Sequence, residues 1–227
     1  MKENGNVLRS HARGAVRLAD MAAEKIRKMI IENKFDAGEP LSEMRLAEMF
    51  NVSRTPIREA IAILEQEGLL TTVHGKGAFI SELKRSDFKE INDLRMVLEP
   101  LAAVSALYTI PPPQLAEHMS VWTHFLSEFE SGLELSATKL AERDDELHFM
   151  YINSCNNKRL QGFLRVLRFQ TNCYVYAHWN TRESIGETIR QHIDIISAIQ
   201  NRDEASLNEA VKAHIEYNNR FIGIYMQ

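Results

Sequence analysis

Strand-forming residues are confined to one short part of this 227-residue chain. Leu69 to Val73 and Ala78 to Ser81 are rich in apolar and β-branched residues, and they flank His74-Gly75-Lys76-Gly77, a composition that favours a hairpin turn. In the sequence on either side, apolar residues recur at spacings of three and four, which is typical of helices that bury one face. The pattern therefore predicts a mainly α protein in which the hairpin belongs to one small domain.

Three predicted helices precede the hairpin and form a domain with it. The first spans residues 16–35 and ends at the turn cluster from Asp36 to Pro40. Ser42 and Ser53 are candidate N-caps of a short second helix and of a third helix that Gly68 ends. The residues expected to face inward are Leu18, Met21, Ala22, Ile26, Met29 and Ile30 on the first helix and Ile57, Ala60, Ile61 and Leu64 on the third. Helices followed by a hairpin in this order predict a winged helix-turn-helix.

The rest of the chain predicts an all-helical second domain. Six helices are expected, at about residues 86–108, 111–131, 135–154, 157–178, 182–201 and 203–226. We therefore divide the chain into a flexible N-terminal arm (residues 1–16), a winged helix-turn-helix (17–84) and an α-helical bundle (85–227).

Charge is distributed unevenly between the two domains. Residues 1–84 carry 13 Lys/Arg and 12 Asp/Glu, a net charge of +1, whereas residues 85–227 carry 14 and 19, a net charge of −5. Phosphate binding depends on the local field and not on the net charge of the whole chain, which is −4. A surface that binds an anion is therefore expected in the first third of the sequence.

The composition favours the cytoplasm. No apolar run approaches the ~20 residues that cross a bilayer, and residues 1–15 lack the apolar core of a signal peptide. The only cysteines are Cys155 and Cys173, so no disulfide framework is expected, in keeping with a reducing compartment. We expect a cytoplasmic, nucleoid-associated protein without membrane contact.

The third predicted helix carries an outward polar face. Arg54 and Arg58 are four residues apart and share one side, with Thr55 beside them near the helix N-terminus. Two guanidinium groups and helix-terminal N–H groups are suited to phosphates and base edges in the major groove. The alternative is that both arginines are solvated charges paired with Glu59 or Glu65.

Five segments of this domain resemble the DNA-binding domain of GntR-family bacterial transcription regulators over residues 17–81. They are Gly38-Glu39-Pro40-Leu41-Ser42-Glu43, Leu46-Ala47-Glu48, Val52-Ser53-Arg54-Thr55-Pro56-Ile57-Arg58-Glu59-Ala60, Leu64-Glu65-Gln66-Glu67-Gly68-Leu69 and Gly75-Lys76-Gly77-Ala78-Phe79-Ile80. The resemblance implies contacts to double-stranded operator DNA by Arg54, Thr55 and Arg58 and by the wing tip at His74 and Gly75. The family often has Arg directly after the Glu of its second helix. Here that position is Met44, and Arg45 follows it as the candidate substitute.

Four polar residues occupy positions in the second domain where apolar residues are expected. Asp144 and His148 share a helix face with apolar neighbours, while His192 and His214 interrupt the apolar stripes of two further helices. Buried polar groups need partners, and three imidazoles with one carboxylate can satisfy one another around a divalent metal. The alternative is three separate core histidines, each hydrogen-bonded to a backbone carbonyl or a tyrosine.

The second domain resembles the all-helical FCD effector domain of the FadR subfamily over residues 86–222. The segments that carry the resemblance are Asp144-Asp145-Glu146-Leu147-His148, Asn156-Asn157-Lys158-Arg159-Leu160, His192-Ile193-Asp194-Ile195-Ile196-Ser197-Ala198-Ile199 and Ala213-His214. The resemblance implies metal ligands at Asp144, His148, His192 and His214 and a role in dimerisation. Six helices in place of seven resemble the subfamily's VanR-type branch. The metal could be Zn, Ni, Mn, Co or Fe.

These observations favour a transcription regulator, and not an enzyme, whose operator binding responds to a small organic acid. Arg95 lies on an apolar helix face and is a candidate clamp for the effector carboxylate, or else a local partner of Glu99. One winged helix reads only a few base pairs, so we expect a homodimer on an inverted repeat. The alternatives are a metal-dependent hydrolase with an accessory winged helix and a winged helix that contacts only proteins.

Overall fold

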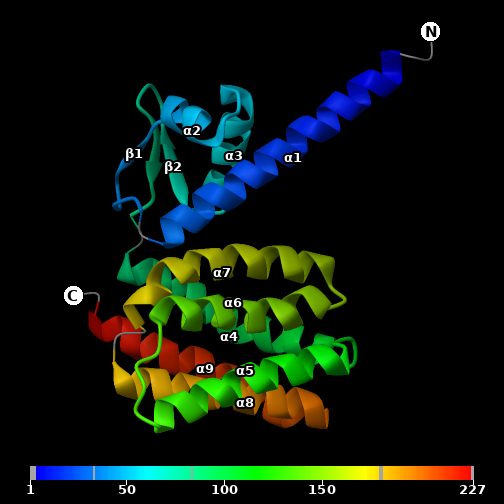
Figure 1. Cartoon of the computed structure of the whole chain (residues 1–227), viewed down its shortest axis with the longest axis vertical. Helices are drawn as coiled ribbons and strands as arrows, with labels where there is room; N and C mark the ends of the chain where they lie inside the picture. Colours follow the sequence, from blue (N-terminus) through cyan, green and yellow to red (C-terminus); the bar gives the residue numbers. More distant parts are fainter. Residues whose placement is uncertain (1–3, 33, 83, 179–180, 226–227) are drawn as a thin grey trace. The chain divides into compact units, whose positions relative to one another are not determined.

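A computed structural model describes residues 4–32, 34–82, 84–178 and 181–225 of the chain (Figure 1). The chain separates into two compact units, residues 1–83 and 84–227. The first contains helices and a small sheet and the second contains helices, so the predicted mainly α class is confirmed. No helix in the part of the chain that the structure describes is long and apolar enough to cross a membrane.

The first unit contains helices α1 (Asn4–Ile31), α2 (Glu43–Phe50) and α3 (Arg54–Gln66). Helix α1 begins twelve positions before the predicted start at residue 16, whereas the mobility expected of residues 1–16 stays a prediction. The predicted inward stripe of α1 is wrong at Leu18 and Met21, which are exposed. The face that packs against α3 consists of Ala19, Ala22, Ala23, Ile26 and Ile30. The three alanines among them let the two helices approach closely.

The wing is a three-stranded antiparallel sheet in the order β1 (Pro40–Leu41), β3 (Gly77–Ile80), β2 (Leu70–Val73). The predicted hairpin is confirmed, with Leu70 opposite Ile80 and Val73 opposite Gly77. The sequence pattern missed β1, which lies at the end of the predicted turn cluster and pairs Pro40 with Phe79. A two-residue edge strand is too short to show alternation, and proline is tolerated at an edge.

A tight connection sets the angle between α2 and α3. The Ser42 side chain caps α2 by accepting a hydrogen bond from the Arg45 amide at 3.3 Å. Asn51 ends that helix in the left-handed conformation, with φ 54°. Ser53 occupies the N-cap position of α3 as predicted, but its side chain makes no capping hydrogen bond. The apolar stripe predicted on α3 is buried, so the outward face of that helix is also the predicted one.

The second unit contains six helices within the residues described, as predicted (Figure 1). They are α4 (Arg85–Ala106), α5 (Pro112–Glu130), α6 (Ala137–Ser154), α7 (Lys158–His178), α8 (Arg182–Asn201) and α9 (Glu204–Tyr225). Helix α4 packs against α6, α7 and α9, and α8 packs against α5 and α9. The bundle core is mostly aliphatic, but a block of polar side chains from five of the helices is buried within it.

Candidate functional site

The four polar residues singled out in the sequence meet in the core of the helical bundle. Asp144 and His148 come from α6, His192 from α8 and His214 from α9, and all four are buried. Each offers one ligand atom, and these atoms lie within 4.8 Å of one another. The apolar stripes therefore located these side chains correctly, because a polar residue within such a stripe must point into the core.

The atoms that converge are one carboxylate oxygen and the Nε2 atoms of the histidines. His148 Nε2 lies 3.1 Å from His214 Nε2 and 3.8 Å from Asp144 Oδ1. His192 Nε2 and His214 Nε2 lie 3.1 Å and 4.0 Å from the same oxygen. Ligand atoms that bind one metal ion at about 2.1 Å lie roughly 3–4 Å from one another. The spacing therefore suits a single ion with a three-nitrogen, one-oxygen donor set.

Partners on the outer side of two rings fix which nitrogen carries the proton. His148 Nδ1 faces Glu99 Oε2 at 2.8 Å, and His214 Nδ1 faces Gln191 Oε1 at 3.2 Å. Both acceptors lack a proton, so each Nδ1 donates and each Nε2 presents a lone pair. The Asn218 amide donates to His214 Nε2 at 3.1 Å, in agreement with that assignment. The His148 Nε2 lone pair therefore faces another acceptor nitrogen across 3.1 Å, an arrangement that a cation would stabilise.

His192 gives a second indication that the cluster suits a cation. Its Nδ1 atom is buried and lacks a hydrogen-bond partner among the residues described, while its Nε2 atom has only the Asp144 carboxylate beside it, at 3.1 Å. Its ring packs against the indole of Trp122, with centroids 4.1 Å apart. A buried nitrogen without a partner is costly, and metal coordination would remove that cost. The donor set and this unpaired ring therefore fit a divalent metal better than three independently satisfied core histidines.

Arg168 on α7 neutralises the carboxylate side of the cluster. Its Nη2 donates to Asp144 Oδ2 and to Asp145 Oδ1, both at 2.6 Å. Burial alone would raise the pKa of Asp144, but Arg168 and the nearby histidines outweigh it and hold that pKa well below its usual range. Burial, with Arg168, lowers the pKa of His148 to about 4. The site therefore keeps an ionised carboxylate beside a neutral imidazole, the protonation states that metal binding requires.

Arg95 is fully buried in α4 and pairs with Glu99, four residues further on. Its Nη1 also donates to Asn92 Oδ1 at 3.1 Å, while Nη2 has no hydrogen-bond partner among the residues described. Glu99 in turn accepts from the Tyr151 hydroxyl at 2.6 Å. The local pair proposed as the alternative for Arg95 is thus present, and one nitrogen of the guanidinium group has no partner among the residues described. The effector-clamp role stays a prediction.

Sequence reasoning missed the outer contacts of the site. Arg168 lies four residues after Leu164 on the buried face of α7, so an apolar stripe could have identified it as it identified the histidines. Glu99 was considered only as a partner of Arg95. Its second oxygen reaches His148, 49 positions away, and no local pattern encodes such a contact.

The residues predicted to read DNA lie on the surface of the first unit. Arg54, Thr55 and Arg58 at the start of α3 are exposed, as are Arg45 on α2 and the wing-tip residues His74 and Gly75. The ion-pair partner of Arg54 and Arg58 is Glu43 and neither Glu59 nor Glu65. The carboxylate of Glu65 instead accepts from the Thr72 amide at 3.0 Å. Met44 is exposed next to Arg45, so both side chains are accessible at that position.

The fold and the two sites define a regulator with a DNA-binding unit and a helical sensing unit. Residues 18–80 match the family model described as bacterial regulatory proteins, gntR family, and residues 90–217 match the FCD domain. The chain belongs to the GntR family of bacterial regulatory proteins and carries an FCD domain. It is a DNA-binding transcription regulator and not an enzyme, which rejects the hydrolase alternative.

Individual relatives agree with this assignment. The chain is 32% identical over 188 residues to the Nta operon transcriptional regulator of Aminobacter aminovorans, covering 83% of this chain and 86% of that protein. It is 23% identical over 218 residues to the Glc operon transcriptional activator of Escherichia coli K12, covering 87% and 86%. The solved structure of E. coli McbR/YncC has a similar fold, with a TM-score of 0.79 and 17% identity over 92% of this chain and 99% of that one.

Proposed function

We propose that this chain is a cytoplasmic, ligand-responsive regulator. Its winged helix binds an inverted-repeat operator, and its FCD domain holds one divalent metal at which a small carboxylate effector binds. The observation that carries the sensing half is the buried convergence of Asp144 with His148, His192 and His214. The six helices among the described residues of this unit support a place in the VanR-type branch.

The metal would be held by the side chains of these four residues. Three neutral imidazoles and one carboxylate accept Zn, Ni, Mn, Co or Fe, so the donor set alone does not select one. Four protein ligands leave room for one or two more on an ion that prefers five or six. An effector carboxylate or water would occupy those positions, and a bound metal would supply the charge that attracts the carboxylate.

Arg95 is the residue proposed to orient the effector. Its Nη2 atom and the amide nitrogen of Asn92 are buried donors without a partner among the described residues. A carboxylate or hydroxyl group of an effector would satisfy both donors, whereas an apolar ligand would leave them unpaired. Arg95 and Glu99 both come from α4, and Glu99 contacts His148. An effector at Arg95 is thereby coupled to the metal ligands through a single carboxylate.

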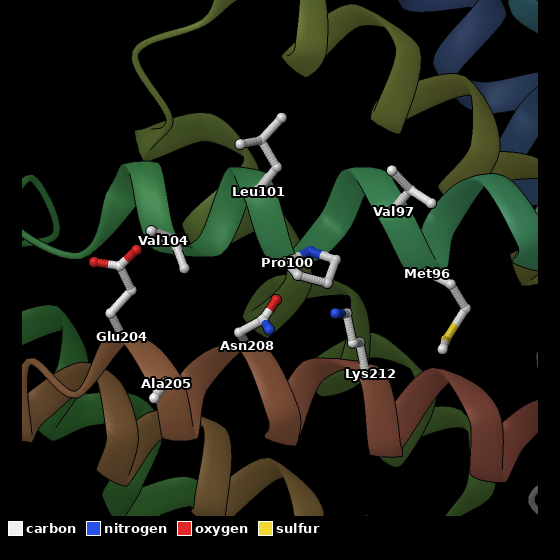
Figure 2. A pocket seen from close by; sticks show the side chains of 9 residues that line it. All are labelled: Met96, Val97, Pro100, Leu101, Val104, Glu204, Ala205, Asn208 and Lys212. Carbon is white, nitrogen blue, oxygen red and sulfur yellow. The ribbon is translucent and has the colours of Figure 1, made fainter.

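A groove between α4 and α9 is the proposed dimer contact (Figure 2). It has a volume of about 600 Å³, with Met96, Val97, Pro100, Leu101 and Val104 on one wall and Glu204, Ala205, Asn208 and Lys212 on the other. Val97 and Leu101 are 69% and 56% exposed although both are large and apolar. Figure 2 shows the two side chains on the same side of α4. Apolar surface of this kind marks a protein contact.

Two opposite charges along the groove select a second copy of this chain as its occupant. Glu204 lies at the end beside Val104, whereas the Lys212 amine points from α9 toward Pro100 (Figure 2). A two-fold rotation about an axis midway between these two charges, near Asn208, brings each of them opposite the other. Glu204 of one copy then faces Lys212 of the next, twice in each dimer, around an apolar centre. The groove is therefore complementary to itself in both charge and polarity.

Two measurements test the proposed function. A gel shift with the purified protein and the DNA upstream of its own gene should show binding that survives excess random-sequence competitor, and candidate carboxylates should change its affinity. Sedimentation at micromolar concentration should give a dimer, and Leu101→Glu should give a monomer because it buries a charge at the centre of the contact. Equal binding to random DNA, or a monomeric wild type, would contradict the corresponding half of the proposal.

A further inference from the structure

Glu43, the first residue of α2, bonds two arginines of the predicted DNA-reading face. Its Oε2 atom accepts from Arg54 Nη2 at 2.9 Å and from Arg58 Nε at 2.8 Å. These residues lie 11 and 15 positions further along the chain. The Ser42 cap and the left-handed Asn51 bring the N-terminus of α3 back beside that of α2, which places the three charges together.

The three side chains are accessible but held in place. Those of Arg54 and Arg58 are 58% and 62% exposed, and that of Glu43 is 30% exposed. The hydrogen bond from Arg58 contributes most to lowering the pKa of Glu43, so the carboxylate is ionised at neutral pH. An ionised group on a surface that approaches phosphates repels DNA. Its presence there calls for a reason connected with recognition.

The contacts to Glu43 use only one N–H group of each arginine. Arg58 is held through Nε, so both of its Nη atoms remain for DNA, and Arg54 is held through one Nη atom. Arginine reads guanine with two N–H groups of a rigid planar fork, so the orientation of that plane decides whether both bonds form. A carboxylate that fixes one nitrogen restricts the plane before DNA arrives and lowers the entropic cost of the base contact.

We propose that Glu43 is a positioning residue that sets DNA specificity by orienting Arg54 and Arg58 and by cancelling one of their two positive charges. Phosphate contacts alone support binding to any sequence, and they gain from every added cation. Glu43 weakens that non-specific component and favours the base-reading pose of the guanidinium groups. The inference rests on the proposed operator binding and adds a residue that opposes overall affinity in favour of discrimination.

The test compares wild type with Glu43→Gln, which keeps the shape of the side chain and removes its charge. Affinity is measured for the protein's own upstream DNA and for a random duplex of equal length, at several salt concentrations. We expect the ratio of the two dissociation constants to fall at least about fivefold, the lower end of what one bidentate base contact contributes. Random-DNA binding should tighten, and its dependence on log salt should steepen by about one ion.

Two further variants separate positioning from a local structural role. Glu59→Gln makes the same change in net charge on α3, at an exposed residue that does not pair with Arg54 or Arg58. For Glu59→Gln, the ratio of the dissociation constants for random and upstream DNA should stay within about twofold of the wild-type ratio. In an Arg58→Ala background, Glu43→Gln should lower the ratio less than it does in wild type, because only the contact between Glu43 and Arg54 then remains to be lost.

The outcomes distinguish this inference from the proposed function. A wild type that prefers its upstream DNA, with an unchanged ratio in Glu43→Gln, would overturn the role of Glu43 alone. An equal fall in the Arg58→Ala background, or in Glu59→Gln, would also overturn it, because the effect would then be one of helix stability or net charge. A wild type without any preference would reject operator binding itself.

Discussion

The two units of this protein contain charge clusters of opposite composition in opposite surroundings. On the DNA-binding unit, one partly exposed carboxylate, Glu43, accepts hydrogen bonds from two arginines. In the helical unit, one buried arginine, Arg168, forms ion pairs with two carboxylates, those of Asp144 and Asp145. Water screens the first cluster, so its ion pairs add little stability and the arginines stay available to DNA. Arg168 and Asp144 are shielded from water, so removing either one leaves an uncompensated charge in the core.

The comparison predicts its largest effect for Arg168→Met. This substitution leaves Asp144 charged in the core without its cation and removes one partner of the partly exposed Asp145, and we expect it to lower the free energy of unfolding by about 3–5 kcal/mol. Urea denaturation of the purified variant measures the loss. Arg165→Met, one turn earlier on an exposed part of α7, is the matched control and should change stability by no more than about 0.5 kcal/mol. Similar losses in both variants would contradict the difference between buried and exposed clusters.

The buried imidazoles predict a pH dependence in the metal-free protein. Burial lowers the pKa of His148 from 6.5 to about 4, so the unfolded chain takes up this proton at a higher pH than the folded chain does. Stability is therefore complete above about pH 6.5 and is lost as pH falls toward 4. This lowering of the His148 pKa from 6.5 to about 4 corresponds to roughly 3 kcal/mol of stability. The pKa values of Asp144 and Glu99 are also lowered, but from 3.8 and 4.5, so these groups add to the loss only at more acidic pH.

Melting temperatures between pH 8 and pH 4.5, measured with chelator present, test this dependence. The exposed His124 provides the control, because His124→Gln should leave the pH profile unchanged. A metal-free protein that is equally stable at pH 7 and pH 5 would show that the bundle imidazoles are not held neutral by burial.

We expect smaller effects for substitutions in the exposed cluster, and these effects concern DNA affinity and not the stability of the fold. Arg54→Ala and Arg58→Ala should each weaken operator binding by about 1–3 kcal/mol, the contribution of one base contact. Their melting temperatures should hardly change, because both side chains are exposed. Fluorescence anisotropy with labelled upstream DNA measures the loss. Operator binding that survives the double substitution would show that α3 does not read bases.

The smallest effect is expected for Arg45→Ala. Arg45 is exposed on α2, next to Met44, where the family often has its arginine. A phosphate contact at this position would carry no sequence information, so operator and random DNA should weaken by about the same factor. The dependence of affinity on log salt should become shallower by about one ion. A loss confined to the operator would instead make Arg45 a base-reading residue.

The contrast between the units also explains how far the sequence could predict the structure. Strand and turn composition located the hairpin, and helical periodicity located the exposed face of α3 and all four residues of the buried cluster, because each depends on a local pattern. The stripe of α1 was misjudged at Leu18 and Met21, where the larger side chains were assumed to face inward although the alanines pack against α3. Size alone does not identify the buried face when close helix packing favours small residues.

Contacts between distant elements lay beyond sequence reasoning. Glu43 with Arg58, Glu99 with His148 and Arg168 with Asp144 join residues 15, 49 and 24 positions apart. Each is set by how the helices pack, which a pattern within one helix does not encode. These pairs nevertheless determine the chemistry of both sites, since they fix the tautomer of His148 and hold the guanidinium group of Arg58.

The metal content of the purified protein tests the central claim most directly. Elemental analysis should find about one divalent ion per chain in wild type and in His118→Ala, and much less in His192→Ala and His214→Ala. Because a ligand that binds only the folded state stabilises it, chelation should lower the melting temperature of wild type, with a loss of about 4 kcal/mol at a thousandfold saturation. A wild type without metal, whose His192 and His214 variants respond to effectors unchanged, would contradict the account.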